Sequence, residues 1–202
     1  MFIVFEGIDG CGKTTQIGLL ESALGRRVLR LREPGGTAIG EDVRVVLLNA
    51  KHAGMSPMTE FLLYMASRAQ LVEQEIRPAL RRGVVVLLDR YYYSTAAYQG
   101  AAGKIGVRYV LDFAEKTCGF PKPDLVVLLD VDAEEAARRS TREKDRVEAK
   151  GLAYQKKVRQ AYLNIAKEEK RRFRVIPTSG SIEDVHQAVK EVVTRALRKN
   201  PR

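Results

Sequence analysis

The sequence has 202 residues, of which 45% are hydrophobic and 30% are charged. This length and composition exclude a disordered chain, and we expect one domain over residues 1–202. No run approaches about 18 apolar residues, which excludes a transmembrane helix. The formal net charge of +10 predicts a phosphate-bearing partner, either a nucleotide or a nucleic acid.

The charged segments and the N-terminus bear on the partners and the compartment. The basic runs at 167–172 and 195–202 mix signs or lie at a terminus, which favours solvated helix faces over a nucleic-acid surface. The apolar run 2–5 is short and has no basic region before it, so we expect no signal peptide. Cys11 and Cys118 lack metal-ligand spacing. These features predict a cytoplasmic protein without nucleic-acid or membrane partners.

The predicted elements alternate between strands and helices along the chain. Apolar runs predict strands at 2–5, 28–31, 84–88, 125–129 and 173–176. Helical periodicity predicts helices at about 17–24, 43–47, 58–82, 107–118, from 133, at 152–172 and at 182–197, with Pro78 kinking or breaking the third. Unbroken apolar strands are typical of parallel sheets covered on both faces. We therefore predict an α/β fold with a doubly wound, five-stranded parallel sheet flanked by helices.

The clearest motif is a phosphate-binding loop between the first strand and the first helix. It matches G-x-x-x-x-G-K-[ST] and comprises Gly7, Ile8, Asp9, Gly10, Cys11, Gly12, Lys13, Thr14 and Thr15. The glycines allow backbone N–H groups to surround an anion, and the helix adds its positive end. Lys13 is suited to the outer phosphates, and the Thr14 hydroxyl is suited to Mg²⁺. A chance glycine turn would not explain the strand and helix on either side.

A second motif follows the third predicted strand. Asp89 is suited to hold Mg²⁺ or its waters, and Arg90 to neutralise a transferring phosphoryl group. The alternative is an ion pair with another partner at a strand end. Tyrosines then cluster at 91–93 and at Tyr98. They fit either a core with polar tips or a nucleoside pocket, and the nearby phosphate loop favours the pocket.

Several motifs in order give a resemblance. In addition to the phosphate-binding loop, these motifs are Arg32-Glu33-Pro34-Gly35-Gly36-Thr37, Gly40-Glu41-Asp42-Val43-Arg44, Ala66-Ser67-Arg68, Asp89-Arg90-Tyr91 with Ser94, Ala97-Tyr98-Gln99-Gly100 and Asp145-Arg146-Val147-Glu148. Together the sequence resembles thymidylate kinases of the bacterial type. The resemblance implies the P-loop kinase fold, transfer of the γ-phosphoryl group of ATP to dTMP to give dTDP and ADP, Mg²⁺, and a homodimer.

The resemblance also implies roles for individual residues. Those implied to bind dTMP are Asp9, Arg32, Glu33, Arg44, Tyr64, Ser67, Arg68, Arg90, Ser94, Tyr98 and Gln99. Arg90 is implied to meet the dTMP phosphate, and Tyr98 to exclude a ribose 2′-hydroxyl. The loop residues would bind ATP, and Thr14 and Asp89 would serve the metal. Since the dTMP phosphate itself attacks, positioning and charge stabilisation carry the rate.

This chemistry requires an arginine beside the transferred group. The middle of the loop has Gly10 and Cys11, so by resemblance a short lid at about 138–150 would supply it. The candidates are Arg138, Arg139, Arg142 and Arg146, although Arg138 and Arg139 also fit a continuation of the preceding helix. The predicted catalytic set is Lys13, Arg90, Asp9, Arg142 and Arg139.

Three other functions compete with this interpretation. A kinase for another small acceptor would share the loop, although Arg32, Arg44 and Arg90 favour a phosphorylated acceptor. A GTP-binding switch is disfavoured, because no Asn-Lys-x-Asp element follows the later strands. A nucleic-acid-dependent ATPase is suggested by the charge alone, and would show binding that falls steeply with salt.

Overall fold

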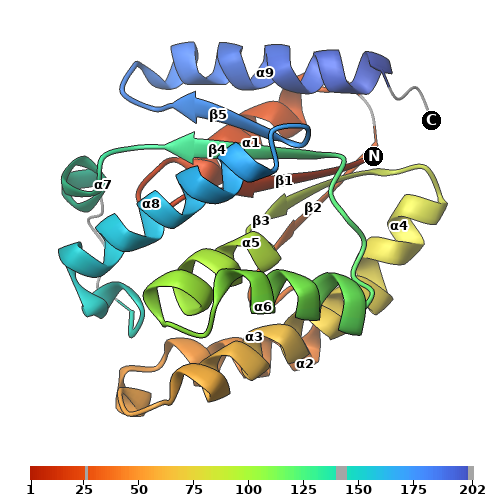
Figure 1. Cartoon of the computed structure of the whole chain (residues 1–202). Helices are drawn as coiled ribbons and strands as arrows, with labels where there is room; N and C mark the ends of the chain where they lie inside the picture. The colour runs from red at the N-terminus through yellow and green to blue at the C-terminus, as the bar shows by residue number, and fades with distance from the viewer. Residues whose placement is uncertain (26, 140–144, 200–202) are drawn as a thin grey trace.

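The computed structural model describes residues 1–25, 27–139 and 145–199. Five parallel strands form one sheet in the order β2-β3-β1-β4-β5 (Figure 1). The strands are β1 (Phe2–Glu6), β2 (Val28–Arg32), β3 (Val85–Asp89), β4 (Leu125–Asp130) and β5 (Phe173–Pro177). The predicted parallel sheet is therefore confirmed, with each strand within one residue of its expected bounds.

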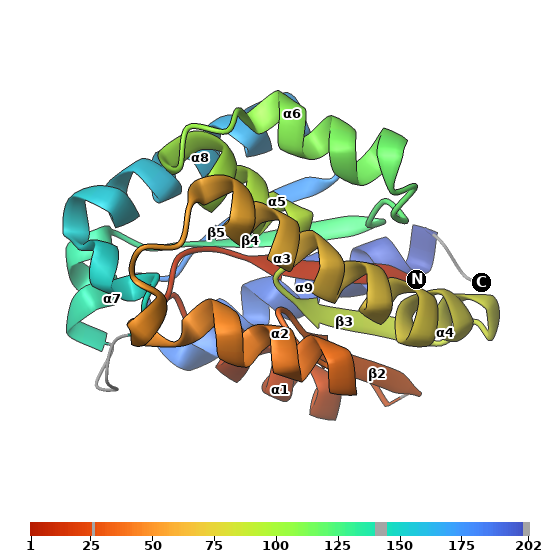
Figure 2. The ribbon, with the colours of Figure 1, turned by 90° about the horizontal axis from the view of Figure 1, so that it is seen from below.

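Helices cover both faces of this sheet. The α-helices are α1 (Lys13–Ala23), α2 (Ala38–Leu48), α3 (Pro57–Leu71), α4 (Arg77–Arg81), α5 (Tyr92–Thr95), α6 (Val107–Asp112), α7 (Ala133–Arg139), α8 (Leu152–Glu168) and α9 (Ile182–Lys199). Shorter turns are 3₁₀ at η1 (Ala50–His52) and η5 (Glu148–Lys150), and π at η2 (Val72–Ile76), η3 (Ala96–Ala102) and η4 (Phe113–Thr117). Figure 2 shows α8 and α6 on the opposite side of the strands from α1.

Local sequence explains where these elements begin. All five residues of β1 are buried, as a central strand covered on both faces requires. The side chains of Thr37 and Ser56 cap α2 and α3 by accepting from the N–H groups of Gly40 and Thr59. Pro57 follows at the first position of α3, where its missing N–H costs nothing.

The segment after β3 differs from the sequence prediction. No helix was expected between residues 91 and 102, yet α5 and η3 run through it. Tyr91, Tyr92 and Tyr93 are fully buried, so for these three the core interpretation is correct and the pocket interpretation is wrong. Their rings pack against the sheet, since Tyr91 lies edge-on to Phe2 of β1 and Tyr93 edge-on to Phe173 of β5. Three adjacent aromatic residues carry no periodicity that would have predicted a helix.

Pro78 does not break the helical run from Pro57 to Arg81. The π turn η2 lies directly before it and α4 continues through it. A π turn widens the helix, which accommodates a proline that would otherwise clash with the preceding turn.

The carboxyl ends of the parallel strands share one edge of the sheet. The arrowheads of β4 and β5 point toward this edge, where α7 lies (Figure 1). Ligands of open α/β sheets bind at such an edge. In the described part of the chain, no helix is long and apolar enough to span a bilayer.

Candidate active site

A cavity of about 1040 Å³ lies at the carboxyl edge of the sheet. It is lined by the phosphate-binding loop, the segments after β2, β3 and β5, and parts of α3 and α7. Its cationic lining residues are Lys13, Arg32, Arg44, Arg68, Arg90 and Arg139, and its carboxylates are Asp9, Glu33, Asp89 and Asp145. The cations outnumber the carboxylates, so the cavity favours anionic ligands.

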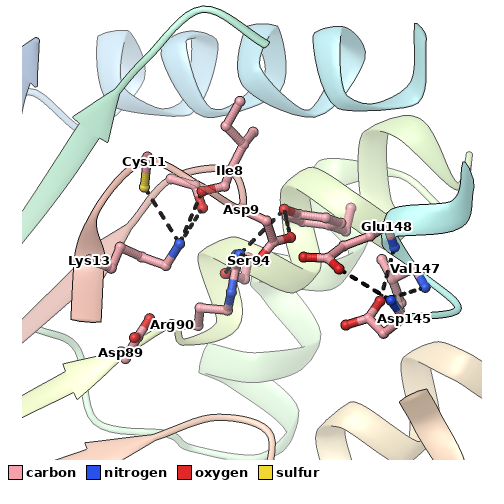
Figure 3. Close-up of polar contacts among 12 residues, drawn as sticks. Ile8, Asp9, Cys11, Lys13, Asp89, Arg90, Ser94, Asp145, Val147 and Glu148 are labelled. Atoms are coloured by element: carbon pink, nitrogen blue, oxygen red, sulfur yellow. Dashed lines mark hydrogen bonds and ion pairs between the residues drawn. The ribbon is translucent and has the colours of Figure 1, made fainter. Parts of the chain in front are cut away.

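Glycine conformation and internal hydrogen bonds shape the phosphate-binding loop. Gly12 caps α1 with φ 92°, a left-handed conformation that suits glycine. The Lys13 ammonium donates to the carbonyl oxygens of Gly7 and Ile8, each at 3.1 Å (Figure 3). Cys11 is buried beneath the loop, and burial raises the pKa of its thiol, which disfavours the reactive thiolate.

Asp9 and Arg90 join the loop to the segment after β3. Arg90 Nη2 donates to Asp9 Oδ1 at 2.7 Å, and the Tyr98 hydroxyl donates to Asp9 Oδ2 at 3.1 Å. Burial alone would raise the pKa of Asp9, but Arg90 and Lys13 lower it to about 2. Asp9 is therefore ionised at neutral pH. Figure 3 shows the pair between the loop and the short helix that follows Arg90.

A buried carboxylate behind Arg90 holds the other side of its guanidinium. Arg90 Nη1 donates to Ser94 Oγ at 3.2 Å and to the Tyr162 hydroxyl at 3.3 Å. Both hydroxyl oxygens lie against Glu6 Oε2, at 2.6 Å and 2.9 Å. Glu6 also accepts from the N–H of Tyr91 at 2.9 Å. These contacts orient Arg90, whose backbone has φ 70°, into the cavity.

Thr14 and Asp89 meet beside the loop. The Thr14 hydroxyl donates to Asp89 Oδ2 at 3.1 Å. Asp89 Oδ1 is buried and has no hydrogen-bond partner among the described residues. A hydroxyl and a carboxylate with spare acceptor capacity fit Mg²⁺ bound together with phosphates. The described residues hold no cluster of three His, Cys, Asp or Glu side chains that would form an all-protein metal site.

Arginines gather on the side of the cavity formed after β2. Arg32 Nη1 and Arg44 Nη1 both donate to the carbonyl oxygen of Pro34, at 2.9 Å and 3.0 Å. Arg32 also pairs with Glu41 at 2.9 Å, and both side chains are nearly half exposed. Burial, followed by the charge of Arg32, lowers the pKa of Arg44. Two neighbouring guanidinium groups are an arrangement suited to a phosphate.

Arg68 and Tyr64 approach the cavity from α3. Arg68 is 1% exposed, and its Nε donates to Glu33 Oε2 at 2.7 Å. Its Nη2 donates to the Thr95 hydroxyl at 3.1 Å. Burial raises the pKa of Glu33 to about 7, against the opposing effect of Arg68. Tyr64 and Arg68 are four residues apart on the helix, which places both on the face that lines the cavity.

The candidate lid arginines occupy different surroundings. Arg138 and Arg139 end α7, and only Arg139 lines the cavity, where its Nη2 donates to the carbonyl oxygen of Thr178 at 2.8 Å. Arg146 is 6% exposed and pairs with Glu60 at 2.5 Å, which removes it as a candidate for the transferred group. Arg142 lies outside the described residues.

Of the predicted site residues that the structure describes, most line the cavity, and Gly7, Ile8 and Ser67 do not. Gly7 and Ile8 contribute carbonyl oxygens to Lys13 from beneath the loop. Ser67 is 1% exposed, and its hydroxyl oxygen accepts from the N–H of Gly35 at 3.1 Å. Ser67 therefore shapes the loop after β2. Asp130, at the end of β4, does not line the cavity and pairs with Arg159 at 2.7 Å.

One wall of the cavity was missed from the sequence. It is formed by Gln16, Thr178, Gly180, Ser181, Ile182 and Val185. Gln16 connects α1 to the start of α9, since its Nε2 donates to the carbonyl oxygen of Ile182 at 3.0 Å. The available signal was the position of residues 178–182 after the last strand, where the carboxyl-edge rule also applies.

A phosphate-binding loop, a hydroxyl and carboxylate pair beside it, and arginines across the same cavity define the class of P-loop phosphotransferases. Comparison with known proteins narrows the class. The family model described as thymidylate kinase matches residues 5–189. A thymidylate kinase from Thermoanaerobacter sp. strain X514 is 46% identical over 200 residues, covering 97% of this chain and 98% of that protein.

Two further relatives agree. A thymidylate kinase from Symbiobacterium thermophilum is 42% identical over 201 residues, covering 98% of this chain and 94% of that protein. The crystal structure of thymidylate kinase from Ehrlichia chaffeensis superposes with a TM-score of 0.77 at 33% identity, covering 96% of this chain and 98% of that one. The chain belongs to the thymidylate kinase family, and it phosphorylates dTMP. The predicted family, fold and reaction are confirmed.

Proposed function

We propose that the cavity carries out the whole transfer, with ATP on the loop side and dTMP on the arginine side. The observation that carries this proposal is the Arg90–Asp9 ion pair of 2.7 Å, which joins the two sides at one point. An oxygen of the dTMP phosphate attacks the γ-phosphorus of ATP in line. A new P–O bond forms, the bond to ADP breaks, and dTDP and ADP leave.

The chain's own residues supply charge and position in this proposal. The loop amides and Lys13 hold the ATP phosphates, and Lys13 exchanges its contacts with the loop carbonyls for them. Arg90 holds the dTMP phosphate with help from Arg32 and Arg44, which line the same side. Arg139, and Arg142 within the segment 138–150, are proposed to stabilise the charge that develops on the transferred group.

Mg²⁺ would neutralise charge on the ATP phosphates. Thr14 and Asp89 are the residues proposed to hold it or its water ligands. The support is the hydroxyl–carboxylate contact of 3.1 Å, together with Asp89 Oδ1, for which the described residues provide no hydrogen-bond partner. Few protein ligands are typical of Mg²⁺ sites that are completed by phosphates.

The base and sugar of dTMP are proposed to lie between α3 and η3. Tyr64 offers an aromatic face, Arg68 a fixed donor, and Gln99 an amide. The ring of Tyr98 stands where a ribose 2′-hydroxyl would need space, with its own hydroxyl on Asp9. Asp9 is in turn proposed to approach the 3′-hydroxyl. Glu33 and Ser94 contribute by fixing Arg68 and Arg90.

A coupled assay over nucleoside monophosphates tests this assignment. With MgATP, the protein is expected to phosphorylate dTMP well and UMP poorly, because UMP carries the 2′-hydroxyl that Tyr98 would exclude. Equal turnover of UMP and dTMP would contradict the sugar assignment. An arm with added DNA or RNA tests the remaining alternative, and stimulated ATP hydrolysis would favour a nucleic-acid-dependent ATPase.

We also propose that the protein acts as a cytoplasmic homodimer formed through α2, α3 and α6. Exposed apolar side chains on these helices support this face: Ile39, Val45, Val46, Met58, Leu62 and Tyr109. The rings of Phe61 and Tyr109 lie 5.9 Å apart, so α3 and α6 pack against each other. Both cysteines are free thiols, in keeping with a reducing compartment.

A further inference from the structure

Glu60 is a buried carboxylate that does not line the cavity. It lies on α3 and is 2% exposed. Its carboxylate accepts from Gln99 Nε2 at 2.6 Å, from Lys150 Nζ at 3.0 Å and from Arg146 Nη1 at 2.5 Å. One side chain thus joins α3, η3 and the segment 145–150. A buried charge costs free energy unless it is paired, so the burial of Glu60 with its partner cations needs an explanation.

The cations keep Glu60 ionised. Burial by itself would raise its pKa, but Lys150, Gln99 and Arg146 together lower the pKa below that of an ordinary glutamate. An ionised carboxylate only accepts hydrogen bonds. The amide of Gln99 therefore presents its NH₂ group to Glu60. Since Gln99 also lines the cavity, its carbonyl oxygen is the acceptor that the amide offers to a ligand.

Arg68 provides a fixed donor beside this acceptor. Residues 60, 64 and 68 lie on one face of α3, because a helix brings residues four apart into line. Glu33 and Thr95 hold the guanidinium of Arg68 in place, at 2.7 Å and 3.1 Å. The two buried carboxylates Glu60 and Glu33 thus fix the two polar groups that face a base.

A donor next to an acceptor suits the edge of thymine or uracil. These bases present a carbonyl oxygen beside a ring N–H. Cytosine presents the reverse pattern, an amino group beside an unprotonated ring nitrogen. A site built to hydrogen-bond one pattern rejects the other strongly, because its buried polar groups are then unpaired.

We propose that Glu60 is a positioning residue that sets base specificity through Gln99, by holding the amide so that its carbonyl oxygen meets the ring N–H of the pyrimidine. This inference rests on the proposed placement of the base between Arg68 and Gln99. Arg146 and Lys150 serve it by compensating the buried charge. Glu60 itself touches no ligand.

Glu60→Gln tests the proposal with little change in volume. An uncharged amide at residue 60 either donates or accepts, so the Gln99 amide is free to turn. The ratio of kcat/KM for dTMP to that for dCMP is expected to fall by about tenfold or more, the size of one hydrogen bond to a charged group. The ratio of dTMP to dUMP should stay unchanged, because thymine and uracil share this edge.

Glu73→Gln is the matched control. Glu73 lies in η2 and pairs with Arg77 at the surface, with its side chain 69% exposed. It undergoes the same chemical change outside the cavity and should keep both ratios. A general loosening of the fold would lower activity on all three substrates together. Only a turned amide would change the dCMP ratio while leaving the dUMP ratio in place.

A double-mutant cycle with Gln99→Ala shows whether Glu60 acts through Gln99. In the Gln99→Ala background, Glu60→Gln should leave the dTMP to dCMP ratio unaltered. If Glu60→Gln does not fold, the double variant Glu60→Gln/Arg146→Met also removes the guanidinium that would otherwise be buried without its carboxylate. The dTMP to dCMP ratio is then compared in this double variant. A folded variant with the wild-type ratio, or an equal fall in the Gln99→Ala background, overturns the proposal. Wild-type protein that does not prefer dTMP to dCMP would instead refute the proposed base placement.

Discussion

Arg138 and Arg139 are adjacent in sequence, yet α7 places them in different surroundings. Arg138 pairs with Glu135 on the surface, with its side chain 69% exposed. Arg139 also contacts Glu135, through its Nε at 3.1 Å, but it lines the cavity and donates to Thr178. If Arg139 stabilises the transferred group, Arg139→Ala should lower kcat by at least about 100-fold. The KM for dTMP should change little, because the contact would be made in the transition state.

Arg138→Ala provides the control for Arg139→Ala in steady-state assays. It removes the same side chain from the same helical turn, and its rates should stay within about twofold of wild type. An Arg139→Ala enzyme that retains wild-type kcat would exclude Arg139 and leave Arg142 as the remaining lid candidate. Arg142→Ala, measured in the same way, then distinguishes the two.

The sequence predicted most of the residues that line the cavity but few of the residues that hold them in place. Lys13, Thr14 and Asp89 follow from motifs whose chemistry requires those residue types. Glu6 does not, because it falls between the predicted strand 2–5 and the phosphate-binding loop and belongs to no motif. Its partners Ser94 and Tyr162 lie 88 and 156 residues further along the chain. Such contacts depend on which elements pack together, which local patterns do not specify.

The phosphate-binding loop packs directly against α7. Gly10 has φ 82°, and a Cβ built on it would lie 2.4 Å from the carbonyl oxygen of Ala136. Gly10→Ala should therefore both strain the loop and displace α7. The left-handed backbone costs about 1–2 kcal/mol, and overpacking adds about 1–3 kcal/mol. Urea unfolding should show the combined loss, and kcat should fall because α7 carries Arg139.

Gly83→Ala isolates the backbone contribution. Gly83 has φ 70° in the turn before β3, and no atom lies within 4 Å of a Cβ built there. Its free energy of unfolding should fall by the backbone cost alone, with kcat unchanged. Equal losses of stability in the two variants would show that the loop and α7 are not tightly coupled.

Elements were predictable to different degrees for physical reasons. The strands could be predicted, since a parallel sheet covered on both faces needs unbroken apolar runs such as 125–129. The helical segments α5 and η3 could not be predicted, because Tyr91 to Gln99 are all buried and so lack the exposed polar face that reveals a helix in a sequence. The order of the strands could not be predicted from the sequence. The wall formed by residues 178–182 was missed, although its position after the last strand was an available signal.

At the scale of the whole molecule, charge and apolar surface are separated. Cations concentrate at the carboxyl edge of the sheet, where Lys13, Arg90 and Arg139 share one cavity. Exposed apolar side chains concentrate on α2, α3 and α6, which lie together in the view from below (Figure 2). The helix α3 belongs to both regions, with Arg68 on its cavity face and Leu62 on its outer face.

Leu62 is the residue through which the proposed dimer is best tested. It is 49% exposed and lies one helical turn from the exposed Met58, so Leu62→Asp would place a charge within the proposed apolar interface. Light scattering after size exclusion should give wild-type protein at twice the 22.6 kDa chain mass and Leu62→Asp near the single mass. Leu19→Asp makes the same change on α1, across the sheet, and should remain dimeric. Because α3 also carries Arg68, the monomer should have a raised KM for dTMP. Wild-type protein that stays monomeric at all concentrations, or equal dissociation by Leu19→Asp, would refute an interface on α3.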